Sequence, residues 1–337
     1  MKIKIIGHTP DEDLIVERTN PWFRFSNSFK KYGHEVVRGE ISSSIFDLLI
    51  VNSHSPKALK RARDLGLSKN RIVMIYWEPT VTYPRIHLAK IRDKYGLVFT
   101  PSRLWEKELR GEYFYFPQPE IKKSIEKFSD WRKRNSLAVM ILANKFSAVH
   151  GQNYSLRRKT GEIIGSNRDF LVDLYGSEWN RSIFYSIRHY IGQLIRTPIG
   201  SIDFFSWRYL GKVQKNYLGA VEDKYKTGAK YKINLVIENS SEYVSEKLFE
   251  AHLTQAIIVY VGAPLIREEI DPEIAITCEP KLELIKDTII NLLRLPDEEK
   301  YKIMKFQNKI ARKESKNRKN DIVLANLATS ILSKLKD

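Results

Sequence analysis

The hydrophobic pattern of the first third of the chain alternates between short apolar runs and longer segments with one apolar face. The runs at 46–52 and 71–79 are apolar almost throughout, which is typical of strands buried on both faces of a sheet. The segment 55–66 begins with Ser-Pro and ends in Gly, the usual start and stop signals of a helix. We predict strands at 2–8, 34–39, 46–52, 71–79 and 97–102, and helices at 22–33, 55–66 and 85–96. Such alternation indicates a parallel sheet covered by helices on both faces.

A second strand–helix alternation follows an interruption of this pattern. Residues 116–134 contain prolines and many charges, and we interpret them as the connection between two domains. Further strands are predicted at 136–147, 170–176, 231–239 and 256–262, and helices at 154–167, 244–255 and 278–295. The expected fold class is α/β, with two Rossmann-like doubly wound domains that face a cleft and with C-terminal helices. The expected bounds are 1–118 for the first domain, 119–134 for the linker, 135–310 for the second domain and 311–337 for the C-terminal helices.

Two segments depart from the alternation. Residues 181–211 are rich in aromatic side chains and arginine, and Asp203 is their only acid. They form either a helical excursion with a small core of its own or a surface for a sugar or a membrane-linked acceptor. Residues 301–320 read as a basic helix and 321–337 as an amphipathic one. A solvated face and packing onto a domain are the favoured interpretations, and anchoring to anionic lipid is the minor alternative.

Charge and cysteine content narrow the classes of partner and location. The formal net charge of +17 favours polyanions: nucleic acid, an anionic membrane surface or phosphorylated small molecules. The single cysteine, Cys278, excludes an intrachain disulfide and suits a reducing compartment. The first residues lack the apolar length of a secretory signal, and no apolar run reaches the ~20 residues of a membrane span. We therefore expect a cytoplasmic protein, either soluble or peripheral at the membrane.

Candidate chemistry concentrates at 231–264, where an apolar strand leads into a helix and a second apolar strand follows. Ligands of open α/β sheets bind at the carboxyl ends of strands, and a helix N-terminus with a nearby Lys suits phosphate. Lys247 provides that cation, and Glu246 suits a ribose diol. Phosphate and ribose together indicate a nucleotide, and without a Walker loop or Gly-rich fingerprint they favour a nucleotide sugar. The structural alternative is that Glu246 complements the helix dipole and Ser245 caps the helix.

The same segment resembles the signature of the family 10 α-1,3/1,4-fucosyltransferases. The family motif runs Tyr-Lys-Phe, an apolar strand, Glu-Asn-Ser, a few residues, Tyr-Val-Thr-Glu-Lys-Leu and then Gly-Xaa-Xaa-Pro-Val. This chain carries "YKINLVIENSS", "YVSEKLF" and "QAIIVYVGAP" in the same order. Weaker similarity extends back to about residue 136, and the first half resembles the family mainly in architecture. The resemblance implies the GT-B fold, with a nucleotide sugar bound by the second domain.

The resemblance also implies a role for each matching residue. Lys247 would bind the phosphates of the donor and Glu246 its ribose. Asn239 and Tyr243 would contact the diphosphate region. A family arginine that precedes a helix clamps phosphate, and Arg158 is favoured for this role by position.

Two choices remain open at this level. Arg157 also fits the phosphate-clamping position, and either arginine could neutralise the charge that develops on the leaving diphosphate; two solvated arginines are the alternative. Glu78, at the end of the apolar run 71–79, matches the place of the family's general base, which takes the proton of the acceptor hydroxyl. A surface turn residue is the alternative there.

The functional prediction is an inverting glycosyltransferase that moves a sugar from a GDP-sugar, GDP-fucose expected, to a hydroxyl of a glycan or glycolipid by direct displacement. The loop before Tyr243 is shorter than in the family, and Gln255 and Ile258 replace a common Gly and Pro, so another donor stays open. The alternative is a non-catalytic protein that binds nucleic acid or anionic membrane on a degenerate GT-B scaffold. Under the leading prediction we expect no nucleic-acid partner and no tightly bound cofactor. No motif requires a divalent metal. The acidic triplet at 11–13 fits an Asp-Xaa-Asp metal motif, but it lies in an early loop far from the nucleotide turn in sequence, and the seven histidines are scattered without ligand spacing.

Overall fold

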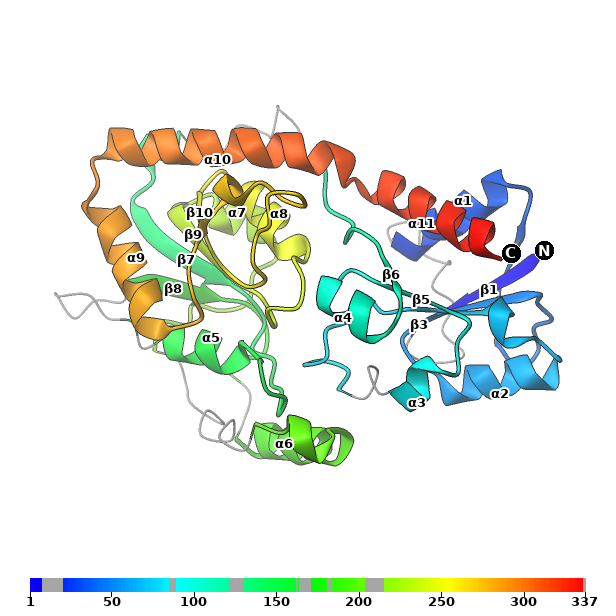
Figure 1. Cartoon of the computed structure of the whole chain (residues 1–337). Coiled ribbons are helices and arrows are strands. Elements are labelled where there is room, and N and C mark those ends of the chain that lie inside the picture. The colour runs from blue at the N-terminus through cyan, green and yellow to red at the C-terminus, as the bar shows by residue number, and fades with distance from the viewer. Residues whose placement is uncertain are drawn as a thin grey trace. The chain divides into compact units, whose positions relative to one another are not determined.

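The computed structural model describes residues 1–7, 21–84, 89–121, 130–161, 163, 171–180, 183–203 and 215–335 (Figure 1). The chain divides into two compact units. Unit 1 comprises Met1–Pro117 together with Asn317–Asp337, and unit 2 comprises Gln118–Lys316. Among the helices that the structure describes, none combines the length and the apolarity needed to span a bilayer.

Unit 1 is built on a six-stranded parallel sheet with the strand order β2-β1-β3-β4-β5-β6. Its strands are β1 (Lys2–Ile6), β2 (Glu35–Val37), β3 (Leu48–Asn52), β4 (Ile72–Ile75), β5 (Leu97–Thr100) and β6 (Glu112–Tyr113). Its helices are α1 (Pro21–Lys31), α2 (Pro56–Asp64), η1 (Lys69–Arg71), α3 (Ala89–Arg92), α4 (Arg103–Glu108) and α11 (Asn320–Lys334).

Helices cover both faces of this sheet because its central strands are apolar on both sides. Phe25 and Phe29 of α1 and Leu327 of α11 pack into one core with alternate strand residues. Helices α2, α3 and α4 supply the core on the opposite face. Ser55 accepts a hydrogen bond from a backbone N–H of the first turn of α2, as the Ser-Pro start predicts.

Unit 2 contains a five-stranded parallel sheet with the strand order β11-β10-β9-β7-β8. Its strands are β7 (Ser136–Ile141), β8 (Val172–Tyr175), β9 (Tyr231–Ile237), β10 (Ile257–Val261) and β11 (Ile276–Thr277). Its helices are η2 (Trp131–Lys133), α5 (Tyr154–Thr160), α6 (Ile183–Arg196), η3 (Ile199–Ser201), α7 (Lys224–Gly228), α8 (Glu246–His252), η5 (Pro272–Ile274), α9 (Leu282–Arg294) and α10 (Asp297–Asn317).

The helices of unit 2 also form two layers. Helices α5 and α9 pack on one face of the sheet through Leu156, Ile285 and Ile289. Helices α8 and α10 cover the other face through residues such as Phe249 and Ala311. Helix α6 extends away from both layers, at the lower edge of Figure 1.

The structure confirms the α/β fold class and the two Rossmann-like units. Helix α10 continues through residue 310 to Asn317, so that only α11 of the C-terminal helices belongs to unit 1. The sequence pattern did not predict α4, β6, α7 or β11, which have two to six residues each and are too short for a recognisable period. The acidic triplet at 11–13 lies outside the described residues.

Candidate functional site

The sheet of unit 2 has its switch point between β7 and β9. Strand β8 lies on one side of this pair, and β10 and β11 lie on the other. The chain leaves β7 toward α5 and leaves β9 toward α8, so both connections start at the same edge of the sheet. In open α/β sheets, ligands bind at the carboxyl ends of the strands beside such a reversal of strand order.

A hydrogen-bonded network connects the end of β9 to the start of α8. The Glu238 carboxylate, only 2% exposed, accepts hydrogen bonds from the Ser245 backbone N–H at 2.9 Å and from its hydroxyl at 2.7 and 2.8 Å. The Lys247 ammonium donates to the same hydroxyl at 3.0 Å and lies 3.4 Å from Glu238 Oε2. Ser245 also caps α8 by accepting from the Lys247 N–H, as the structural interpretation predicted.

Electrostatics keep both residues of the Glu-Lys pair charged. Burial lowers the pKa of Lys247, but the carboxylates of Glu238 and Glu246 outweigh it and raise the pKa above its ordinary value. Burial likewise disfavours the charged form of Glu246, and the Lys247 ammonium at 3.4 Å holds the pKa of that carboxyl below its ordinary value. The Glu246 side chain remains 38% exposed, so it can still accept hydrogen bonds from a ligand.

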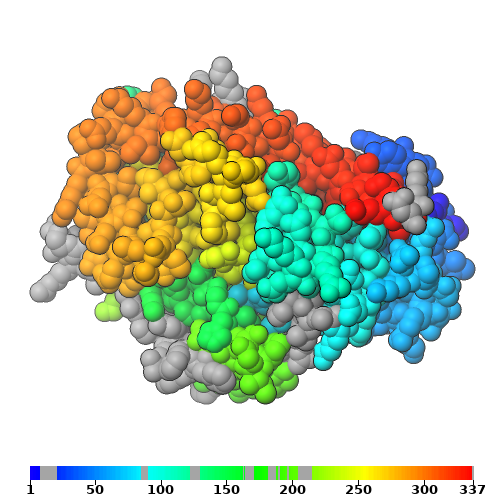
Figure 2. Space-filling view, in the orientation of Figure 1, coloured from blue at the N-terminus to red at the C-terminus, as the bar shows by residue number. Residues whose placement is uncertain are grey.

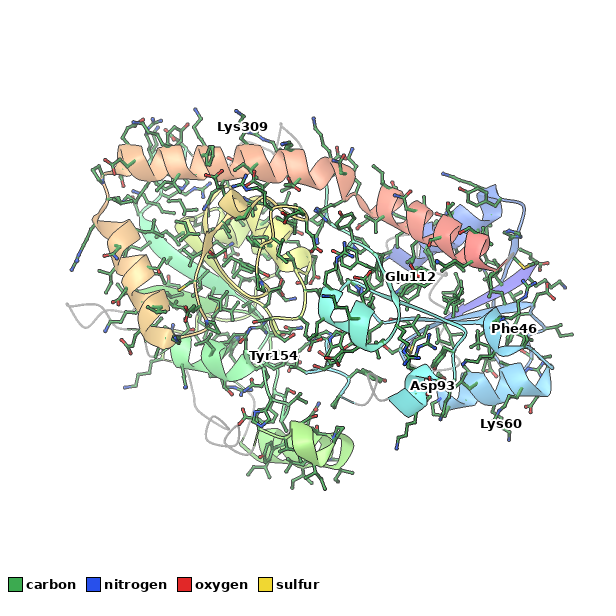
Figure 3. All side chains as sticks on the ribbon, viewed as in Figure 1. Phe46, Lys60, Asp93, Glu112, Tyr154 and Lys309 are labelled. Carbon is green, nitrogen blue, oxygen red and sulfur yellow. The ribbon has the colours of Figure 1, made fainter. Side chains whose placement is uncertain are left out.

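Arg157 on α5 connects the two sides of the switch point. Its guanidinium donates from Nε to the Ile237 carbonyl at 3.0 Å and from Nη2 to Asn239 Oδ1 at 2.8 Å. The residue is 2% exposed, and burial lowers its pKa. The backbone of Asn239 also accepts from the Asn153 N–H at 2.8 Å, just before α5 begins at Tyr154, which is labelled in Figure 3.

Arg158 points toward a different segment, the loop that follows β7. It donates to Asn144 Oδ1 at 2.8 Å and to the Lys145 carbonyl at 2.7 Å, and its guanidinium lies 5.2 Å from the centre of the Phe146 ring. Burial, followed by the charge of Arg157, lowers the pKa of Arg158 to about 10. Its Nη1 is buried and has no hydrogen-bond partner among the described residues.

A pocket of about 210 Å³ adjoins the Glu-Lys pair on the side of α7. Its lining includes the end of β7, the middle of β9 and the side chains of Glu246, Lys247 and Glu250. Lys224 of α7 donates to Glu250 at 2.6 Å, and the Tyr225 hydroxyl donates to the same carboxylate at 3.4 Å. Burial raises the pKa of Glu250 despite the nearby Lys224. The pocket therefore combines apolar walls with the Glu250 carboxylate, which lies near Glu246, the residue predicted to bind ribose.

The structure brings most of the sequence-predicted residues to one place. Glu246, Lys247 and Asn239 lie at the switch point, and the half-buried Tyr243 lies in the turn between β9 and α8. Glu78 belongs to unit 1, where it is partly exposed in the bend after β4.

Several polar residues of the site were not assigned a role from the sequence. Glu238 is the buried partner of Lys247, and its place directly after an apolar strand was the available signal. Lys224 and Glu250 come together only through the packing of α7 against α8, which no local pattern encodes. Among the described residues, no three His, Cys, Asp or Glu side chains are grouped closely enough to hold a metal ion.

Comparison with known proteins finds solved structures with a similar fold but no match in sequence to a family model or a curated protein. The Anabaena protein Alr3699/HepE in complex with UDP-glucose is similar with a TM-score of 0.59 and 12% identity, over 99% of each chain. An α1,3-fucosyltransferase with GDP is similar with a TM-score of 0.56 and 14% identity, over 100% of this chain and 90% of that one. An α-glucosyltransferase in complex with UDP-glucose and DNA containing an abasic site reaches 0.55 and 14%, over 98% and 99%.

These likenesses concern the fold. The chain has the GT-B architecture of two Rossmann-like units. At 12–14% identity they do not extend to substrates, so the family 10 resemblance of residues 231–264 remains a prediction.

Proposed function

We propose that this protein is a glycosyltransferase that takes its sugar from a nucleoside diphosphate donor bound at the switch point of unit 2. The observation that carries the proposal is the part-buried Lys247 ammonium, held between Glu238 and Glu246 and close to Arg157. A cation that is partly shielded from water and held in place before the ligand arrives is suited to the diphosphate of a donor. The GT-B fold and the nucleotide-bound structures it resembles support this assignment.

The donor would use three parts of the site. Its phosphates would contact Lys247 and the guanidinium groups of Arg157 and Arg158, with Asn239 and Tyr243 at the same region. The ribose hydroxyls would donate to the exposed oxygen of Glu246, and the base would enter the adjoining pocket. We propose a GDP-sugar, with fucose as the sugar, because residues 231–264 resemble the fucosyltransferase signature.

The proposed reaction is an inverting displacement. An acceptor hydroxyl of a glycan or glycolipid attacks the anomeric carbon, the bond from that carbon to the diphosphate oxygen breaks, and Glu78 accepts the hydroxyl proton. The leaving nucleoside diphosphate takes the bonding electron pair, and its developing charge falls beside the site cations. No covalent intermediate on the protein is required. We propose that the enzyme acts in the cytoplasm.

A thermal-shift series with GDP, UDP, CDP and their sugars tests the donor site. At about 100-fold excess over the dissociation constant, the matching nucleotide should raise the melting temperature of unit 2 by about 5 °C or more. Lys247→Ala should remove the shift. Lys226→Ala is the matched control, because Lys226 lies on the neighbouring α7 with 74% side-chain exposure and does not line the pocket. A lack of response to every nucleotide would refute the donor site.

Transfer itself requires a separate assay. Labelled GDP-fucose is incubated with a panel of glycans and glycolipids, and the anomeric configuration of any product is determined by NMR. Glu78→Gln should abolish transfer and leave the nucleotide thermal shift intact, because it removes the proton acceptor alone. Full transfer by this variant would exclude Glu78 as the base, and retained anomeric configuration would exclude direct displacement.

A further inference from the structure

Helix α6 carries an unusual row of exposed apolar side chains. Ile187, Ile191 and Ile195 recur every four residues and are 40%, 51% and 71% exposed. Ile199, one step further in η3, is 81% exposed. Side chains four apart lie on one face of a helix, so Ile187, Ile191 and Ile195 form one row on α6, which we call the isoleucine stripe; Ile199 lies beyond the end of this helix. Soluble proteins expose single apolar residues freely, but an aligned row marks a surface that meets another apolar phase.

The stripe is displayed on a supported helix. On α6, the Tyr190 ring packs edge-on against Phe146 at 5.1 Å between ring centres. After η3, an antiparallel bridge pairs Val149 with Ile202, and the Asp203 N–H donates to a loop carbonyl at 2.7 Å. One side of the segment is thus fixed to the loop that follows β7. The isoleucine stripe remains on the surface, and the light-green region that contains α6 lies at the lower edge of Figure 2.

The charge of the segment selects the partner. From residue 181 to 202 the sequence contains three arginines and no acid, and the described Arg188 is exposed beside the stripe. A helix with an apolar stripe and basic flanks lies in the interface of a bilayer, with its apolar face at the acyl boundary. Anionic headgroups attract each nearby Lys or Arg, and the net charge of +17 adds to the attraction.

A second copy of the chain is a poorer occupant. A stable protein–protein interface buries about 800 Å² on each partner and contains paired polar groups at its rim. The exposed isoleucines supply only a narrow apolar line, and the exposed Arg188 beside it would meet a like charge on the same surface of a second chain.

We propose that the isoleucine stripe docks this protein on anionic lipid bilayers, with α6 lying in the headgroup region. Docking would place the loop at Phe146, which contacts both α6 and Arg158, on the membrane side of unit 2. The proposal does not depend on the donor chemistry, since lipid binding can be measured without any nucleotide.

Vesicle sedimentation tests the proposal. The full chain is mixed with phosphatidylcholine vesicles with and without about one third phosphatidylglycerol. We expect binding to the anionic vesicles and at least about tenfold weaker partitioning after combined replacement of Ile187, Ile191 and Ile195 by Ser. The matched control replaces three other exposed apolar residues by Ser, and it should bind as the wild type does. Its positions are Leu137, Leu284 and Ile322, which are 47%, 40% and 43% exposed.

A second variant separates the stripe from the basic face of α10. Lys302, Lys305 and Lys309 are exposed on that helix, and their replacement by Glu reverses its charge; Lys309 is labelled in Figure 3. If this variant loses vesicle binding and the isoleucine variant keeps it, α10 is the membrane surface and the proposal is wrong. A failure of the wild type to bind anionic vesicles would also overturn it.

Three further measurements remove the remaining ambiguities. Sedimentation equilibrium must show the same mass for the wild type and the isoleucine variant, because a dimer lost with the stripe would identify a second copy as its occupant. The melting temperature of the variant should match the wild type, since the replaced side chains are exposed. Retained nucleotide shifts in this variant would keep the lipid result separate from the donor site.

Discussion

The buried pair of Glu238 and Lys247 gives a quantitative test of the site. The two charged groups lie 3.4 Å apart, where their attraction is about 5 kcal/mol at an effective dielectric constant of about 20. Two features reduce the share of this attraction that a measurement would assign to Glu238 and Lys247. The Lys247 side chain is 20% exposed, and Glu246 shares the same ammonium at 3.4 Å. We therefore expect a coupling free energy of about 2–3 kcal/mol between Glu238 and Lys247.

A double-mutant cycle measures this coupling. Lys247→Met should lower the free energy of unfolding of unit 2 by about 3 kcal/mol, because it leaves the Glu238 carboxylate buried without its cation. Glu238→Gln should cost a similar amount, and the double variant should cost clearly less than the sum of the two. Urea unfolding followed by circular dichroism gives the three values if the slope of the transition is unchanged.

An exposed pair provides the control. Glu279 and Lys281 approach to 2.7 Å, closer than the buried pair, but their side chains are 64% and 69% exposed. Their cycle should show no coupling beyond the error of the measurement, because water screens such a pair. Additive effects at Glu238 and Lys247, or equal coupling in both cycles, would refute the conclusion that burial fixes the Lys247 ammonium.

Three further variants test other parts of unit 2. Gln255 has a φ of +53°, a conformation in which Gly is less strained, so Gln255→Gly should raise the free energy of unfolding by about 0.5–1 kcal/mol in urea titrations; a loss would refute the strain. A Cβ at Gly262 would lie 2.6 Å from Glu238 Cγ, so Gly262→Ala should lower stability by about 1–3 kcal/mol, whereas Gly200→Ala, with open space around it, should not. Burial lowers the pKa of His252 to about 3, below the value of about 6.5 in the unfolded chain. The contribution of His252 to the free energy of unfolding is therefore complete above pH 6.5 and declines as the pH falls below it. Between pH 8 and pH 5 the free energy of unfolding of the wild type should therefore fall by about 2 kcal/mol more than that of His252→Gln, as measured by urea titration at each pH. Equal decreases in the two proteins would refute this assignment.

The strands and the Glu-Lys turn could be predicted because their signals are local. Buried parallel strands are continuous apolar runs, and Ser245 is an N-cap residue directly before the first turn of a helix. The orientations of Arg157 and Arg158 could not be predicted in this way, because they depend on packing and not on a local pattern. Successive residues of a helix point about 100° apart, so only the packing of α5 decides that Arg157 meets the end of β9 and Arg158 meets the loop after β7.

The segment at 181–211 shows why two sequence interpretations can each contain part of the structure. Tyr190 packs against Phe146, which agrees with a small helical core, and the isoleucine stripe faces outward, which agrees with a docking surface. One side of this amphipathic helix packs against the loop after β7, and the other is the side for which we propose docking. The amino-acid composition of the segment averages over both faces of the helix, so it cannot distinguish the packed face from the exposed one.

The division of unit 1 between the two ends of the chain has a consequence for biosynthesis. Helix α11 contributes Leu324, Leu327 and Ile331 to the core that covers β1 and β3, so this core stays incomplete until α11 has left the ribosome. Unit 2 is continuous from Gln118 to Lys316 and can close its own core earlier. The strands of unit 1 therefore wait for a helix that is synthesised after all of unit 2, so unit 2 can complete its core before unit 1 does.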